Sequence, residues 1–212
     1  MEISEIKACE KAIEDSKRAL ITNSLRNQVV IAFSGLRRSG NHACIDWVSS
    51  AFLGRPTNLQ PVSSHIFRSN CENVLLFNEV NMAPYFADLI SVNRPRIARA
   101  KLVLMSVDDV VISKDSVYTP PNTRIVYVTR HLLDIIASRL TLNMRKAEDG
   151  IDRGDMGVNW QLIRQHKELQ SLGKLGLLWD YSLWQSDPIW RRLFLRKLGL
   201  SADFSIEMAI AG

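Results

Sequence analysis

The residues best suited to bind an anion lie in one short loop at residues 34–40, which reads Ser-Gly-Leu-Arg-Arg-Ser-Gly. Gly35 and Gly40 allow a tight turn. The backbone N–H groups of residues 39–41 would then begin the helix that follows. Because the first N–H groups of a helix have no partner within it and lie at the positive end of its dipole, they form an anion site. The loop is therefore predicted to hold an oxyanion such as phosphate or sulfate.

Three side chains of this loop add to its capacity to bind an anion. Arg37 and Arg38 supply fixed positive charge with bidentate geometry, and Ser39 supplies a hydroxyl. A plainer interpretation is an ordinary turn between a strand and a helix, with two solvated arginines on it.

The loop matches the phosphate-binding loop of nucleoside triphosphatases only in part. That loop has the pattern G-x-x-x-x-G-K-[ST], and Gly35 and Gly40 keep its spacing. Asn41 replaces its lysine, and His42 replaces the hydroxyl that binds magnesium. Without these two groups, the β- and γ-phosphates of a magnesium nucleotide would be poorly held. The sequence thus favours an oxyanion loop over an ATPase loop.

A second candidate anion-binding segment follows an apolar run that ends at Val128. Arg130 stands at the end of this run, Asp134 falls in the first turn of the next predicted helix, and Ser138 lies about two turns into it. Arg130 and Ser138 are roughly 12 Å apart along the chain and could both face a crevice above a sheet. Asp134 would complement the helix N-terminus. The plainer interpretation is a surface charge and a helix hydroxyl.

These motifs must be positioned by elements whose apolar patterns can be read in the sequence. Short apolar runs that suit buried strands occur at 28–33, 74–77, 101–105, 123–128 and 177–179. Helices are expected over 3–26, 43–52, 132–147, 158–171 and 188–198. Strands alternating with helices predict an α/β fold with a parallel β-sheet flanked by helices, and any ligand at the carboxyl ends of the strands. With no linker or repeat to divide it, the chain is expected to be a single domain over 1–212, with 1–27 as an N-terminal helix leading into the core.

Together the two motifs resemble those of the PAPS-dependent sulfotransferases, where PAPS is 3′-phosphoadenosine 5′-phosphosulfate. The first loop of that family reads P-K-S-G-T-T and binds the 5′-phosphosulfate, and residues 37–42 stand in its place as Arg-Arg-Ser-Gly-Asn-His. The second family motif is an arginine with a serine eight residues later, which bind the 3′-phosphate; Arg130 and Ser138 have that spacing. The resemblance covers about residues 28–200 and implies a P-loop nucleotide-kinase-like fold.

The resemblance also implies an activity. It implies transfer of a sulfuryl group from PAPS to an acceptor hydroxyl, for example of a carbohydrate, or to an amine, with PAP as product. No metal is implied, because no cluster of residues has metal-ligand spacing. Arg38 would stabilise the transferring group. The implied cofactor contacts come from Arg37, Arg38, Ser39, Gly40, Asn41, His42, Arg130 and Ser138.

The sequence departs from the family pattern at several positions. Arg38 stands where the family usually has lysine, which keeps the charge and changes its geometry. Ala43 stands where many cytosolic members have a tryptophan that stacks on adenine; Trp179 could stack there instead, or could pack in the core. The chain ends at Gly212 without the basic, Gly-rich loop of cytosolic members. Either this protein does without that loop or the sequence is truncated.

Three positions could supply the base that accepts the proton of the acceptor. Glu79 follows an apolar run in a stretch that resembles the segment of heparan-type sulfotransferases where a glutamate is the base, and it is the first candidate. Asp108 or Asp109 stands where cytosolic members place a histidine. His42 could also reach the sulfate. The residues expected not to be catalytic, for want of supporting partners, are His65, His131 and His166.

Composition narrows the class of protein further. The chain has 212 residues, 46% hydrophobic and 23% charged, which argues against a disordered, collagen-like or coiled-coil protein. No apolar run reaches the roughly 18 residues of a membrane span, and the charged N-terminus is unlike a signal peptide. Cys9, Cys44 and Cys71 lack a metal-ligand pattern and predict reduced thiols in a cytoplasmic protein. The net charge of +5 and the pI near 9.3 favour an anionic small molecule over nucleic acid.

Two other functions stay open from the sequence. A P-loop small-molecule kinase would agree with the spacing of Gly35 and Gly40, but the absence of its lysine argues against it. A catalytically silent nucleotide-binding or scaffold protein would keep the fold without turnover. The acceptor pocket is expected to come from variable loops at 53–73, 80–97 and 142–158, which do not identify the acceptor. The oligomeric state does not follow from the sequence.

Overall fold

The structure, a computed structural model, describes residues 3–63, 65–69, 73–79, 86–112, 120, 122–148 and 159–200. Its strands are β1 (Val29–Gly35), β2 (Leu59–Ser63), β3 (Ile66–Ser69), β4 (Val74–Phe77), β5 (Leu102–Asp108), β6 (Arg124–Thr129) and β7 (Leu177–Asp180). Its helices are α1 (Ile3–Ser24), α2 (Asn41–Leu53), α3 (Phe86–Val92), α4 (Arg94–Arg99), α5 (Leu132–Glu148), α6 (Trp160–Leu175), α7 (Tyr181–Ser186) and α8 (Pro188–Lys197).

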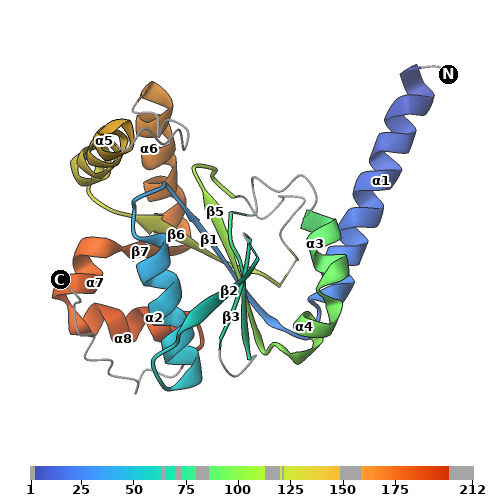
Figure 1. Cartoon of the computed structure of the whole chain (residues 1–212), viewed down its shortest axis with the longest axis horizontal. Helices are drawn as coiled ribbons and strands as arrows, with labels where there is room; N and C mark the ends of the chain where they lie inside the picture. Colours follow the sequence, from blue (N-terminus) through green and yellow to red (C-terminus); the bar gives the residue numbers. More distant parts are fainter. Residues whose placement is uncertain are drawn as a thin grey trace.

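The strands form one seven-stranded sheet in the order β2-β3-β4-β5-β1-β6-β7, and helices flank it (Figure 1). Five neighbouring strands of this sheet, β4-β5-β1-β6-β7, are parallel to one another. The central strands β1 and β5 are buried almost along their whole length, as their continuous apolar runs predict. The predicted α/β fold with flanking helices is therefore confirmed, and the sheet is mostly rather than wholly parallel.

An antiparallel hairpin of β2 and β3 extends one edge of the sheet and corrects the prediction of a variable loop at 53–73. Side chains of β2 are half-buried or exposed, because it is the outermost strand of the sheet. Such an edge strand lacks the apolar run by which a central strand is recognised in sequence. The other two predicted loops are also partly helical. Helices α3 and α4 take up 86–92 and 94–99, α5 extends to Glu148, and the rest of 142–158 lies outside the described residues.

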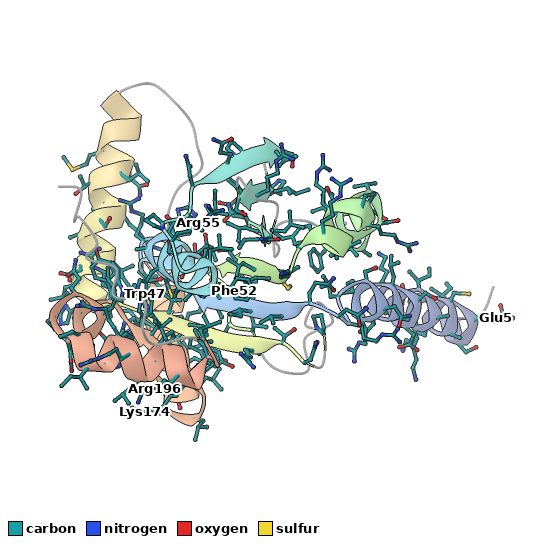
Figure 2. The ribbon with its side chains drawn as sticks, turned by 90° about the horizontal axis from the view of Figure 1, so that it is seen from below. Glu5, Trp47, Phe52, Arg55, Lys174 and Arg196 are labelled. Atoms are coloured by element: carbon teal, nitrogen blue, oxygen red, sulfur yellow. The ribbon has the colours of Figure 1, made fainter. Side chains whose placement is uncertain are left out.

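Two layers of helices cover the two faces of the sheet. Side chains of β1 alternate between them: Val30 and Ala32 pack with α1 and α3 to α6, whereas Ile31 and Phe33 pack with α2, α7 and α8. Trp47 of α2 lies against α8, its ring centroid 5.9 Å from that of Phe194 (Figure 2). Burial on both faces explains why these strands read as apolar runs without alternation.

Helix α1 extends away from the sheet, with Glu5 near its far end (Figures 1 and 2). Its last turns pack beside α3 and α4, where Ile21 is buried, but Ile6 and Ile13 are 39% and 57% exposed. The expected helix is present, and much of its apolar stripe lies at the surface. Within the described ranges, no helix has both the length and the apolar character needed to cross a bilayer.

Strand β1 is the point at which the strand order reverses. The chain leaves β1 through α2 toward β4 and β5 on one side, and later crosses to β6 and β7 on the other. In open parallel sheets, ligands bind outside the carboxyl ends of the strands at such a point. The predicted anion-binding loop, residues 34–40, begins at the end of β1 and thus lies at the position where the fold favours a ligand.

Candidate functional site

A pocket of about 350 Å³ opens at the carboxyl edge of the sheet, a size within the usual range for small-molecule sites. All five parallel strands lead into it, and α5 adds one further residue. Residues of both predicted anion motifs share this pocket although they are far apart in the sequence. Its lining consists of Arg37, Arg38, Gly40, Asn41, His42, Ala43, Glu79, Asp108, Arg130, Ser138 and Tyr181.

Backbone conformation singles out the same edge of the sheet. In the described part of the chain, the non-glycine residues with positive φ are Arg38 (72°), Glu79 (54°) and Asp109 (60°). They lie just beyond the ends of β1, β4 and β5, which are neighbours in the sheet. Such conformations cost about 1–3 kcal/mol each and persist where the surroundings hold them, most often at ligand sites. The strained backbone therefore supports a functional site here.

Gly40 lets the loop lie directly on two aromatic rings. Its φ is 103°, and a Cβ at this position would lie 2.6 Å from Cδ2 of Tyr181 and 3.1 Å from Cζ3 of Trp179. Both the conformation and the close contact require glycine. The glycine predicted from turn chemistry is thus also needed for packing.

Replacing Gly40 with Ala is expected to lower stability by about 1–3 kcal/mol, because the new methyl group meets Tyr181 in a strained conformation. The displaced loop should also have a lower affinity for PAP, the ligand that the sequence predicts for it. Thermal denaturation and calorimetric titration with PAP measure the two effects. Gly54→Ala is the matched control: Gly54 also has positive φ, at 65°, but its Cβ would meet nothing within 4 Å. Unchanged PAP affinity in Gly40→Ala would contradict a role for the loop in binding.

Ser39 contributes to the loop differently from the prediction. Its side chain is fully buried and donates to Oδ1 of Asn41 at 3.3 Å, and its backbone N–H donates to the carbonyl of Leu36 at 3.0 Å. Ser39 is not among the residues that line the pocket, so its predicted contact with a ligand finds no support in this structure. Asn41 lines the pocket, and its amide donates to Oδ1 of Asp108. The residue that replaces the ATPase lysine therefore connects the loop to β5.

Arg130 and Tyr181 form one wall of the pocket. The guanidinium of Arg130 lies over the ring of Tyr181, 4.7 Å from its centroid, and its Nε is 3.5 Å from Oδ2 of Asp134. His166, which is buried behind this wall, hydrogen-bonds the carbonyl of Arg130 at 2.9 Å through Nε2. The side chain of Arg130 is thus held by the ring of Tyr181 and the carboxylate of Asp134, and its backbone carbonyl is held by His166.

The two predicted anion motifs meet within the pocket. Nε of Arg38 donates to Oγ of Ser138 at 2.9 Å. Arg38 is expected to hold the sulfuryl end of the cofactor and Ser138 the 3′-phosphate, and their direct contact brings these two predicted subsites together. Arg38 is exposed, and the hydroxyl of Ser138, which accepts from Nε of Arg38, still has its own proton to donate to a ligand.

Two carboxylates face the pocket, and their environments differ. Glu79 lies 3.7 Å from Nη2 of Arg37 and is about one-third exposed. Asp108 is the last residue of β5, paired with Gly35 in the sheet, and only 8% exposed. Burial raises the pKa of Asp108 above its ordinary value, although the hydrogen bond from Asn41 opposes the shift. His42 and Arg37 also oppose it, whereas the negative charge of Glu79 adds to it.

The predicted stacking role of Trp179 is not possible in this structure, because its side chain has no exposed surface. It packs edge-on against Tyr181, with ring centroids 5.7 Å apart, and beneath Gly40. Tyr181 lines the pocket in its place and was missed from the sequence. The only signal for it in the sequence is its position just after the strand at 177–180, at the carboxyl edge of the sheet where a ligand is expected.

The other predicted site residues divide clearly. His42 lines the pocket, whereas Asp109, the alternative to Asp108, is paired with Arg139 and does not. His65, His131 and His166 are also absent from the lining, although the pairing of His166 with Arg130 is a contact that the sequence did not indicate.

A larger cavity, of about 750 Å³, lies at the opposite edge of the sheet. It is lined by the end of α1 and by α4, and contains three basic residues but no carboxylate or histidine. It holds none of the predicted motifs. Size alone therefore does not identify the functional site, and the smaller pocket is the better candidate.

Among the residues that the structure describes, no group of three or more His, Cys, Asp or Glu side chains could hold a metal ion. Cys9 and Cys44 are free thiols, one exposed and one buried, while Cys71 lies outside the described residues. The chain matches no protein-family model, no curated protein and no solved structure in comparisons with each.

Proposed function

We propose that this protein is a sulfotransferase that moves a sulfuryl group from PAPS to an acceptor hydroxyl or amine, on a P-loop nucleotide-kinase-like fold. The observation that carries the proposal is that both anion motifs line one pocket at the strand-order reversal. PAPS carries anionic groups at its 5′ and 3′ positions, and the pocket offers basic residues from two separate elements. The strained loop backbone adds to this support.

In this proposal the two arginine-bearing segments divide the cofactor between them. The start of α2 and Arg38 bind the phosphosulfate, because helix N-termini and arginine both favour oxyanions. Arg130 and Ser138 bind the 3′-phosphate, with the hydroxyl of Ser138 donating to it. Tyr181 offers the adenine an aromatic surface in place of Trp179.

We assign the base to Asp108, with Glu79 as the alternative. A base works best when its pKa approaches the operating pH, and burial shifts the pKa of Asp108 in that direction. Asn41 fixes its carboxylate at the pocket wall. Glu79, the first candidate from sequence, is paired with Arg37 and is suited to orient that arginine.

The reaction then needs one proton acceptor and one set of charge-stabilising groups. The acceptor oxygen forms a bond to sulfur as the bond from sulfur to the bridging oxygen breaks, and PAP leaves with the electron pair. The acceptor proton passes to the carboxylate of Asp108. Arg38 stabilises the charge that develops on the transferring group and the bridging oxygen.

Replacing Arg38 with Met is expected to lower turnover more than it weakens PAP binding, because charge on the bridging oxygen develops in the transition state. Sulfate transfer from PAPS and calorimetric titration with PAP give the two numbers. If turnover and affinity fall by the same factor, Arg38 is a ground-state anchor only.

The direct test of the proposed function is binding and turnover by the unaltered protein. A thermal-shift screen of PAP, PAPS, ATP and NAD should show stabilisation by PAP and PAPS. Sulfate transfer to a broad acceptor panel should follow. Failure to bind PAP would exclude the function, and binding without turnover would favour a silent nucleotide-binding protein. Magnesium-dependent ATP binding would favour the small-molecule kinase, which keeps the loop spacing but has Asn41 bound to Asp108 where the lysine would act.

A further inference from the structure

We infer that Asp109 and Arg139 are a positioning pair that holds the backbone of the anion-binding loop in its binding conformation. For its effect on ligand affinity the inference rests on the proposed function. Neither residue lines the pocket, so neither is a binding or catalytic residue. Their contacts nevertheless converge on one residue of the loop, Arg37.

Both backbone polar groups of Arg37 are held by this pair. Oδ1 of Asp109 accepts the N–H of Arg37 at 2.9 Å, and Nε of Arg139 donates to the carbonyl of Arg37 at 3.3 Å. The two side chains are themselves joined, since Nη2 of Arg139 donates to Oδ1 of Asp109. The N–H and the carbonyl of Arg37 belong to the two peptide units on either side of its Cα, so neither unit can rotate without breaking one of these bonds.

The pair is anchored in the body of the fold. The N–H of Asp109 donates to the carbonyl of Gly35 at 2.9 Å, and its carbonyl accepts from Nε2 of Gln165 at 2.7 Å. The side chain of Arg139 is only 4% exposed on α5. Asp109 therefore connects the ends of β1 and β5 with α5 and α6, and a buried arginine without its carboxylate would be costly.

This anchoring explains the strained residue that follows. Arg38 has a φ of 72°, a conformation that a non-glycine residue keeps only when its neighbours hold it. Holding Arg37 from both sides supplies that constraint. Arg139 also adjoins Ser138 on α5, so the same helical turn fixes the loop and places the serine 2.9 Å from Nε of Arg38. Without the pair, ligand binding would have to order the loop and would be weaker.

The experiment compares Asp109→Gly and Asp109→Asn in the full chain. Glycine and asparagine both tolerate the φ of 60° at position 109, so neither substitution adds backbone strain. Glycine removes the carboxylate altogether, whereas asparagine keeps an acceptor for the Arg37 N–H and loses the charge. Ile90→Ala, in the core on α3 and outside the pocket, controls for a general loss of stability.

The readouts are PAP affinity by calorimetry and hydrogen exchange of the Arg37 amide in the ligand-free protein, both well below the unfolding temperature. Asp109→Gly should weaken PAP by at least about tenfold and speed exchange at Arg37 by a similar factor, the loss expected for a charge-assisted hydrogen bond. Asp109→Asn should show smaller changes in the same direction. Ile90→Ala should lower the unfolding temperature without changing either readout.

Each outcome decides a separate question. If the unaltered protein does not bind PAP, the proposed function fails, and exchange at Arg37 still tests the pair. If it binds PAP and Asp109→Gly binds equally well with unchanged exchange, the positioning role is wrong. Should Asp109→Gly not fold, Asp109→Asn decides: equal affinity and exchange to the unaltered protein overturn the inference, and a loss in both supports it.

Discussion

Replacing Asp108 with Asn is expected to lower sulfate-transfer turnover by about 10²–10⁴-fold, the usual contribution of a placed base. PAP affinity should stay nearly unchanged, because asparagine keeps the shape of the side chain and can still accept a hydrogen bond from Asn41. Initial rates with saturating PAPS and calorimetric titration with PAP measure the two effects.

Glu79→Gln is the matched comparison, because Glu79 is the other carboxylate of the pocket. It should reduce turnover far less than Asp108→Asn, mainly by releasing Arg37. The opposite result, with Glu79→Gln inactive and Asp108→Asn active, would identify Glu79 as the base, in agreement with the first candidate from the sequence.

Asp108→Asn should also change how the stability of the folded protein depends on pH. Burial raises the pKa of Asp108 in the folded protein above its unfolded value of about 3.9. The folded state therefore binds this proton more tightly, and the ionised carboxylate costs stability at every pH above the folded pKa. That cost falls as the pH is lowered through the folded pKa, and is gone below the unfolded one.

Asp108→Asn should accordingly melt at a higher temperature than the unaltered protein at pH 8, with the difference shrinking toward pH 4. Melting curves of the two proteins over this range measure it, since the other titrating groups are shared. A lower melting temperature for Asp108→Asn at pH 8 would show that the partners of the carboxylate outweigh its burial. Gain of stability with loss of activity is the pattern expected of a functional group.

Replacing Arg130 with Ala is expected to weaken PAP by at least about tenfold, because a charge-assisted hydrogen bond of about 1.5–3 kcal/mol is lost. Adenosine 5′-phosphosulfate, which has no 3′-phosphate, should be affected much less. Calorimetric titration of both ligands gives the ratio of the two losses. Equal losses would remove the assignment of Arg130 to the 3′-phosphate.

Two controls separate the charge of Arg130 from its contact with Tyr181. Arg130→Lys keeps the charge and loses the planar group over the ring, so an intermediate affinity is expected. Lys174→Ala removes an exposed positive charge on α6, outside the pocket lining (Figure 2), and should leave PAP affinity unchanged. A similar loss in Lys174→Ala would indicate a general effect of net charge.

The sequence alone determines the central strands and the loop after the first of them. The runs predicted as buried strands at 28–33 and 101–105 correspond to β1 and β5, and they are apolar without interruption because both faces of a parallel sheet are covered. Gly35 and Gly40 stand out because turn chemistry is a property of the local chain. The hairpin of β2 and β3 and the short helices α3, α4 and α7 lack such a local signal and were missed.

The residues of the site likewise divide into those that the sequence reveals and those that only the fold brings together. Arg38, Gly40, Arg130 and Ser138 can be recognised because each motif lies within one segment, where spacing along the chain predicts spacing in space. Which strands become neighbours is decided by the order of the sheet, and this order alone brings β4, β5 and β7 to the loop after β1.

The tertiary structure therefore decided the contacts that cross between segments. It turned Trp179 into the core and Tyr181 toward the pocket, and it placed the amide of Asn41 against Asp108. It also held the loop through Asp109, by way of a buried arginine on α5. Local propensity and periodicity carry no information about such pairs, because their energies depend on the burial and the distances that only the packed fold creates.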